Sequence, residues 1–410
     1  MQRKKSRQHL GVLCLSGLAA GLFASGLAFA QDREPSPQEM WEIIQQQQRE
    51  IEELKARQSA TDEKVEATAD RIEEVTVKEP AGGMVEGWWN KTSIGGYGEM
   101  HYNGGNQDQI DFHRFVLFFG HQFTDRIRFL SEIEIEHSLV GESKPGEVEL
   151  EQAYVEFSLT DRIQSKVGLF LIPVGILNET HEPPTFFGVE RNIVETNVIP
   201  TTWWEGGVGV QADLGAGFST DVAVHSGLNV VTTGNSAFLP RGGRQKVANA
   251  VAEDPALTGR IKWTRIPGIE LAVAAQYQDD LTQGQDVDAV LLETHASIRR
   301  GPWWLRALYA RWDLGGDLPK ALGRDEQYGW YIEPGYIFGT GKGDVGVFAR
   351  YSQVDNAAGD TTDSKIKQTD IGLNYWPHPQ VVLKADYQFV DVPAGQIGDD
   401  RINLGVGFMF

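Results

Sequence analysis

Acidic and imidazole side chains gather in one stretch of this sequence, residues 173–204, which reads PVGILNETHEPPTFFGVERNIVETNVIPTTWW. We call this stretch the insert, and its ionisable residues are Glu179, His181, Glu182, Glu190, Arg191 and Glu195. Glu179, His181 and Glu182 have the chemistry of metal ligands, but neither a second His nor a Cys lies nearby to complete a transition-metal shell. We therefore expect no metal ion and no cofactor here.

Catalytic chemistry has little support in the rest of the chain. Ser138 follows His137 directly, but a nucleophile and a base work together only when a fixed geometry joins them. Nothing in the sequence fixes that geometry. We predict no catalytic residues and no enzyme activity.

The insert lies between two segments in which apolar and polar residues alternate, and neither strand nor helix periodicity continues through it. A compact domain rarely keeps about 30 residues without regular structure unless they have a function. We predict that the insert folds into a pore and constricts it, with its six ionisable residues at the narrow part.

The composition favours a membrane barrel built from strands. Glycine is frequent, with 46 residues, and the 11 Trp and 11 Tyr residues would supply aromatic girdles. The sequence contains no apolar run of the roughly 18 residues that a transmembrane helix needs. These features argue against a helical membrane protein.

The chain begins with features of a cleaved secretory signal over residues 1–30. Basic residues precede an apolar run, and Ala28, Phe29 and Ala30 form a cleavage site. The single cysteine, Cys14, lies inside this segment, so no disulfide is expected after cleavage. Cleavage removes four basic and no acidic residues, so the net charge changes from −20 to −24. So acidic a surface makes nucleic acid an improbable partner.

Residues 31–78 are predicted to form a periplasmic coiled-coil stalk, followed by a linker over 79–90. A heptad pattern favours an oligomeric coiled coil, with a trimer preferred, although the many polar positions are also compatible with a single exposed helix. The a and d positions are Ile44, Gln47, Ile51, Leu54, Gln58, Thr61, Val65, Thr68, Ile72 and Val75.

Residues 91–410 alternate apolar and polar side chains with period two, which predicts an all-β, 16-stranded antiparallel transmembrane barrel. Short connections alternate with long ones, as expected for turns on the periplasmic side and loops outside. The predicted strands are 93–103, 110–122, 126–138, 147–159, 162–172, 205–214, 217–228, 258–266, 268–279, 287–299, 302–313, 326–338, 342–353, 365–376, 379–391 and 399–410.

The alternation also predicts which side chains face the lumen. With the apolar set facing lipid, as Ile402 and Leu404 would, the basic residues pointing inward are Arg114, Arg128, Arg260, Lys262, Arg299, Arg306, Arg350 and Lys384. The acidic residues pointing inward are Glu99, Glu132, Glu134, Glu136, Glu156, Asp221, Glu270, Glu293, Glu333, Asp370 and Asp386. These charges could pair with each other or form a local basic ladder.

Two further groups of side chains belong to the ends of the barrel. Arg241, Arg244 and Lys246 lie in the predicted outer loop 229–257, where they could steer anions to the mouth or simply be solvated. The aromatic residues near strand ends, which predict interfacial girdles, are Trp88, Trp89, Trp203, Trp204, Trp303, Trp330, Tyr336 and Trp376.

Two segments resemble a known family. The segments IDFHRFVLFFGHQFTDRIRFLSEIEIEH (110–137) and GLFLIPVGILNETHEPPTFFGVERN (168–192) are similar to the phosphate-selective porin O and P family of bacterial outer-membrane channels. The resemblance covers most of residues 91–410. It implies a trimeric porin in the outer membrane of a Gram-negative bacterium, a constricting third external loop, and basic side chains that pass an anion along the pore.

These observations give two hypotheses for function. The first is passive diffusion of small hydrophilic solutes or inorganic ions through a homotrimeric channel in outer-membrane lipid, with phosphate suggested by the resemblance. Because the insert carries four Glu against one Arg, weak selectivity or a cation preference is expected instead. The second is a structural tether that contacts the cell wall through the stalk.

Overall fold

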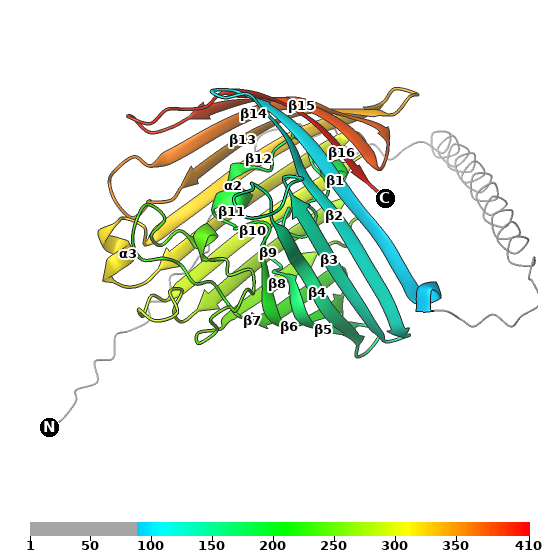
Figure 1. Cartoon of the computed structure of the whole chain (residues 1–410), viewed down its shortest axis with the longest axis horizontal. Coiled ribbons are helices and arrows are strands. Elements are labelled where there is room, and N and C mark those ends of the chain that lie inside the picture. The colour runs from blue at the N-terminus through cyan, green and yellow to red at the C-terminus, as the bar shows by residue number, and fades with distance from the viewer. Residues whose placement is uncertain (1–87) are drawn as a thin grey trace, which may run out of the picture. The chain divides into compact units, whose positions relative to one another are not determined.

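The computed structural model describes residues 88–410, so the predicted signal peptide, the stalk and most of the linker lie outside the described residues. The described residues form sixteen strands in one closed barrel in which every strand pairs antiparallel with its neighbours (Figure 1). The strands are β1 (Thr92–Gly104), β2 (Gln109–Thr124), β3 (Ile127–Glu136), β4 (Val148–Ser158), β5 (Ile163–Leu171), β6 (Trp204–Gly215), β7 (Phe218–His225), β8 (Ala256–Trp263), β9 (Ile269–Gln278), β10 (Ala289–Arg300), β11 (Trp303–Leu314), β12 (Glu326–Gly339), β13 (Asp344–Asp355), β14 (Lys365–His378), β15 (Val381–Asp391) and β16 (Arg401–Met409).

The barrel closes where the last strand meets the first. Strand β16 pairs with β1 from the Tyr97 and Met409 partners to the Gly104 and Ile402 partners. Beyond the strand end, the Phe410 N–H donates to the Gly96 carbonyl at 2.9 Å. Because closure pairs the backbone all the way round, the wall has no open strand edge, which is what a bilayer requires.

Side chains alternate across the wall as the sequence predicts. In β16, Ile402 and Leu404 are about half exposed on the outer face, whereas Asn403 is fully buried on the inner face. In β15, Leu383 is exposed and Lys384 is buried. The predicted 16-stranded all-β barrel is therefore confirmed.

Some strand ends differ from the prediction. Strand β7 ends at His225 instead of 228, because Gly227 adopts a φ of +76° that extended strand does not allow. The turn around Pro267 is also wider than one residue: β8 ends at Trp263, β9 begins at Ile269, and the Ile269 N–H donates to the Ile266 carbonyl.

Three of the predicted girdle aromatics lie inside the barrel. Trp203 is completely buried, and Trp204 and Trp376 are nearly so. The Trp376 indole donates to the Pro184 carbonyl at 3.1 Å, so it holds the insert instead of meeting the membrane surface. The prediction for these residues was wrong because nearness to a strand end does not show which face a side chain takes. By contrast, Trp303 is 65 % exposed.

The described helices are short and lie outside the strands: η1 (Trp88–Lys91), η2 (Pro183–Thr185), α2 (Ile193–Asn197), η3 (Pro240–Gly243) and α3 (Asp317–Ala321). Within residues 88–410, no helix has the length and apolar character to cross a bilayer. Helices η2 and α2 belong to the insert. Helix α2 contacts β12 and β13, and η2 contacts β1, β15 and β16.

Candidate pore constriction

The insert leaves the wall between β5 and β6, and its base is closed by one side chain. The Asn178 amide donates to the Ile172 carbonyl at 2.7 Å and to the Trp203 carbonyl at 2.9 Å. Its carbonyl oxygen accepts from the Trp203 N–H at 2.6 Å. The two ends of the insert are therefore bound together where it leaves the wall.

Glu195 stabilises the fold of the insert and does not face the lumen. It is fully buried. Asn192 caps α2 by accepting from the Glu195 N–H, while the Glu195 carboxylate accepts from the Ile176 and Leu177 N–H groups at 2.8 and 2.6 Å. Tyr331 of β12 donates to the other carboxylate oxygen at 2.9 Å. The expectation that Glu195 lines the narrow part is wrong, because its buried carboxylate accepts hydrogen bonds from backbone N–H groups of the insert.

The segment before α2 packs on the opposite wall. Phe187 fits between Gly335 and Gly346, where an added Cβ would lie 2.5 and 2.6 Å from its ring. Its ring stacks on Phe348 with centroids 5.1 Å apart. The neighbouring Val189 N–H donates to the Asp386 carboxylate at 2.6 Å. Glycines on the inner face thus form the slot that receives the insert.

Glu179 is paired with charged groups of the wall. Its carboxylate accepts from Arg260, which also binds Asp221 at 2.9 Å. Burial opposes ionisation of Glu179, but the charge of Arg260 and its hydrogen bond hold the pKa of this carboxyl below its ordinary value.

Glu190 is paired on the other side of the lumen. It lies 3.1 Å from the His101 imidazole and accepts from the Asn103 amide at 2.9 Å. Burial would raise the pKa of Glu190, yet the hydrogen bond and charge of His101 lower it to about 2. Glu182 is half-buried, and its backbone carbonyl accepts from Thr185.

Above the insert lies a cavity of about 420 Å³, here called the outer cavity, between the insert, the ends of β1 to β4 and the loop after β7. Basic and acidic side chains both line it. The basic ones are Arg114, Arg191, Arg241, Arg244 and Lys246, and the acidic ones are Glu99, Glu136, Glu149, Glu151 and Glu190.

Three arginines of the outer cavity donate to neutral oxygens. Arg191 donates to the Thr202 hydroxyl at 2.8 Å, and Arg244 to the Thr202 carbonyl at 2.6 Å. Arg241 donates to the carbonyls of Thr196 and Thr201. Burial lowers the pKa of Arg191, and the charge of Arg114 adds to this effect. Among the described residues, none of the three guanidinium groups forms a direct ion pair, although carboxylates line the same cavity.

Lys246 differs from its two predicted partners at the outer mouth. Its ammonium binds Glu147 at 2.9 Å and also binds Glu149. Its charge is therefore compensated, whereas Arg241 and Arg244 reach across to the insert.

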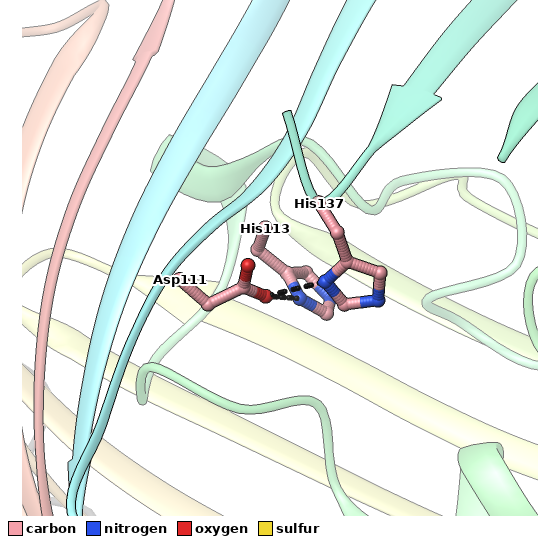
Figure 2. A group of neighbouring side chains, drawn as sticks. All are labelled: Asp111, His113 and His137. Carbon is pink, nitrogen blue, oxygen red and sulfur yellow. Dashed lines mark hydrogen bonds and ion pairs between the residues drawn. The ribbon is translucent and has the colours of Figure 1, made fainter. Parts of the chain in front are cut away.

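A cluster of two imidazoles and a carboxylate borders the same cavity (Figure 2). The Asp111 carboxylate lies 2.7 Å from Nδ1 of His137 and 3.2 Å from Nδ1 of His113. The ring of His113 also stacks on His101 with centroids 4.8 Å apart. His137 therefore pairs with Asp111 across the strands.

The predicted basic residues of the lumen do not form one continuous ladder. Arg350 binds Glu333 at 3.0 Å and Asp370 at 2.8 Å. Two others contact the insert, since Arg306 donates to the Thr185 carbonyl at 3.0 Å and Lys384 lies 3.5 Å from the centre of the Phe186 ring. The remaining pairs are Arg114 with Glu99 at 2.9 Å, Arg128 with Glu156 at 2.7 Å, Lys262 with Glu270 at 3.6 Å, and Arg299 stacked over Trp304 at 5.1 Å.

Sequence alternation missed Glu151, which is buried on the inner face of β4. The pairing of β3 with β4 shifts by one residue, because Glu132 pairs with Gln152 whereas Ile133 pairs with Leu150. This bulge reverses the alternation, so Glu151 and Glu156 both point inward although they are an odd number of residues apart. The sequence signal that could have indicated this was the presence of four acidic residues, at 147, 149, 151 and 156, within one predicted strand.

Comparison with known proteins agrees with this architecture. Residues 94–394 match the family described as phosphate-selective porin O and P. The chain belongs to this family. An uncharacterized protein of Aquifex aeolicus (strain VF5) is 33 % identical over 338 residues, which cover 72 % of this chain and 74 % of that protein.

Solved porins share the fold at low identity. The anion-selective porin from Comamonas acidovorans has a TM-score of 0.56 at 13 % identity and covers 78 % of this chain and 99 % of its own. Salmonella typhi OmpF in complex with daunomycin has a TM-score of 0.56 at 14 % identity, with 78 % and 97 % covered. The outer-membrane channel DcaP of Acinetobacter baumannii has a TM-score of 0.54 at 15 % identity, with the same coverage. The protein is thus an outer-membrane porin of the Gram-negative type, a channel for small solutes. Porins of this family and fold are known as channels, not enzymes.

Proposed function

We propose that this porin passes small hydrophilic anions, with inorganic phosphate as a fitting solute, through the outer cavity and past the insert. The supporting observation is the set of Arg191, Arg241 and Arg244, which line that cavity and donate to neutral oxygens. In the described part of the chain, none of the three forms an ion pair with a carboxylate. An anion entering the cavity would meet three guanidinium groups that are free of direct ion pairs and can bind it.

This proposal reverses the cation preference expected from the sequence. That expectation counted the glutamates of the insert as charges in the pore. However, Arg260 binds Glu179, His101 binds Glu190, and Glu195 is buried among N–H groups. Glutamates that are paired in this way contribute less field to the lumen than the three arginines do.

The test is the reversal potential of the purified porin in a planar bilayer under a salt gradient. We expect an anion preference for the natural protein. Arg191→Gln together with Arg244→Gln should lower the anion-to-cation permeability ratio about fivefold, the effect of losing roughly 1 kcal/mol of attraction. A cation preference in the natural protein, or an unchanged ratio in the double variant, would show the proposal to be wrong.

Arg324→Gln is the matched control. Arg324 also lies in an outer loop and also donates to backbone carbonyls, those of Ala237 and Asn235. Since Arg324 does not line the outer cavity, its loss should leave the permeability ratio unchanged.

We also propose a homotrimer in outer-membrane lipid. OmpT of Vibrio cholerae, in a structure described as its trimer form, has a TM-score of 0.53 with this chain at 9 % identity. The barrel exposes outward apolar side chains suited to lipid or to another copy, such as Val222, Val273 and Ile332. The tether hypothesis depends on residues 31–78, which lie outside the described residues, and the comparisons favour a channel.

A further inference from the structure

Three buried side chains converge where the insert meets the wall. Glu132 of β3 and Glu151 of β4 are each 1 % exposed, and His181 of the insert is 3 % exposed. His181 Nε2 lies 3.7 Å from Glu132 Oε1 and 3.7 Å from Glu151 Oε2. Among residues 88–410, none of these three atoms finds a hydrogen-bond partner. Their lone pairs are thus directed into one small space that bulk water does not reach.

The two distances from His181 Nε2 fit a shared ion better than hydrogen bonds. A separation of 3.7 Å is too long for a hydrogen bond between nitrogen and oxygen. Two donors that bind one zinc ion at about 2.1 Å with tetrahedral angles lie about 3.4 Å apart. Movements of a few tenths of an ångström would therefore bring His181 Nε2 and either carboxylate oxygen to the spacing of two ligands of one ion, and all three atoms already lie within 4.8 Å of one another.

The acidic groups around the three atoms would also be stabilised by a cation. Burying carboxylates without partners is costly, because each loses its hydration. Glu134 lies beside Glu151 and is a third acidic group at this place. Arg114, whose charge acts on Glu151, is already bound by Glu99 at 2.9 Å and by Glu134 at 3.3 Å.

Neighbouring groups hold the ligand atoms in place. The Nδ1 atom of His181 lies 3.3 Å from the Asn178 carbonyl, which favours the tautomer with a free lone pair on Nε2. The Gln152 amide donates to the second oxygen of Glu132 at 2.7 Å. The bulge between β3 and β4 turns Glu151 inward. Metal-binding carboxylates and imidazoles are usually supported in this way.

We propose that Glu132, Glu151 and His181 bind a divalent transition-metal ion of the zinc class, which ties the insert to the barrel wall. One imidazole with two carboxylates suits zinc, manganese or iron(II), and water would occupy a remaining position. Glu151 also lines the outer cavity, which gives the ion a route from outside. The expectation of no metal ion considered only neighbours in sequence, whereas two of these ligands come from distant strands.

Two other groups in the described barrel have comparable donors but weaker grounds. Asp111, His113 and His137 are partly exposed and already paired with one another (Figure 2). Glu149, in the group with Glu134 and Glu136, is bound by Lys246. The site at His181 is distinguished by buried ligand atoms that form no hydrogen bond with one another.

Zinc binding by the untagged full-length protein tests the proposal. The protein is treated with a chelator, dialysed against micromolar Zn²⁺, and its metal content is measured by mass spectrometry. We expect the natural protein to bind one ion that His181→Gln and Glu151→Gln do not, with affinity at least about 100-fold lower in each variant. Co²⁺ in place of Zn²⁺ should give a visible absorption band that both variants lack.

His137→Gln is the matched control, because it removes a donor from the other imidazole cluster and leaves the ligands of the proposed site intact. It should keep both the bound ion and the Co²⁺ band. Circular dichroism checks that each variant folds. If His181→Gln does not fold, Glu151→Gln is the variant that tests the proposal. Equal zinc content in the natural protein and a folded variant would overturn the proposal, as would loss of the ion in His137→Gln alone. The result does not depend on which solute the porin conducts.

Discussion

At the scale of single residues, the charge of a side chain says little about the pore until its partner is known. Glu195 and Arg191 lie four residues apart in the insert. The carboxylate of Glu195 is fully used by the Ile176 and Leu177 N–H groups and Tyr331, whereas Arg191 keeps its charge facing the outer cavity. The insert is acidic by count, but of its two charged residues that line the outer cavity, Glu190 is paired with His101 and Arg191 has no ion pair in the described barrel.

The Glu190 and His101 pair predicts a defined dependence of stability on pH. The folded state holds the pKa of Glu190 at about 2, below the ordinary value of about 4.3. Its contribution is therefore fully present above about pH 4.3 and is lost as the pH falls toward 2. Because the pair is partly exposed, we expect the ionised Glu190 to contribute on the order of 1–2 kcal/mol to the free energy of unfolding.

Thermal unfolding in detergent measures this effect. The natural protein should be more stable than Glu190→Gln at pH 7 and pH 5, and the difference should shrink between pH 4 and pH 2. A difference that stays constant over that range would show that Glu190 ionises normally. Glu182→Gln, a half-buried Glu in the same insert, should show no comparable change.

At the scale of elements, the insert depends on the shape of the inner wall as much as on charge. Phe187 occupies a slot between β12 and β13 that exists because Gly335 and Gly346 have no side chains there. Phe348 and Trp376 complete the contact as aromatic neighbours of Phe187. Strand glycines here are places where another segment approaches closely.

Filling that slot should move the insert. Gly346→Val would place carbon atoms within the Phe187 ring, where even a Cβ lies at 2.6 Å. We expect Phe187 to leave the slot and single-channel conductance to rise, by about twofold if the constriction limits flow. Gly339→Val is the control, because the nearest atom to its Cβ would be Asp344 Oδ1 at 3.5 Å. An unchanged conductance in a folded Gly346→Val would mean that the insert does not limit flow.

The sequence predicts the strands well and the insert poorly, for physical reasons. Lipid on one face and water on the other impose period two on every strand, so sixteen strands can be counted directly. The bulge that turns Glu151 inward has no such signature, because one extra residue simply reverses the pattern. The five residues of α2 are too few to show helical periodicity. Contacts such as Arg244 with Thr202 depend on how a distant loop folds back.

At the scale of the whole molecule, the wall separates two environments along each strand. In β7, Val222 is 46 % exposed on the outside, whereas Asp221 faces inward and binds Arg260. The other strands of the closed ring have the same arrangement, with one set of side chains facing outward and the alternate set facing the lumen. The effect of a substitution on stability should therefore depend first on which face of the wall the residue occupies, and then on the chemistry of the new side chain.

Placing one charge on each face tests this separation. Val222→Arg puts a cation in lipid and should destabilise the barrel by about 2–4 kcal/mol if it lies near the bilayer centre. Ser219→Arg, on the inner face of the same strand, should cost less than about 1 kcal/mol because water can solvate it. Urea unfolding in lipid vesicles compares the two, and equal losses would contradict the assignment of faces.

The closure of the insert by Asn178 has a consequence for how such channels diverge. Because Asn178 binds Ile172 on one side and Trp203 on the other, the strands on either side continue as though joined by an ordinary hairpin. Residues 179–202 can therefore change without altering the registration of β5 and β6, as long as Asn178 is kept. The part of the selectivity that Arg191 supplies can thus change independently of these two strands, whereas the part that Arg241 and Arg244 supply belongs to the loop after β7.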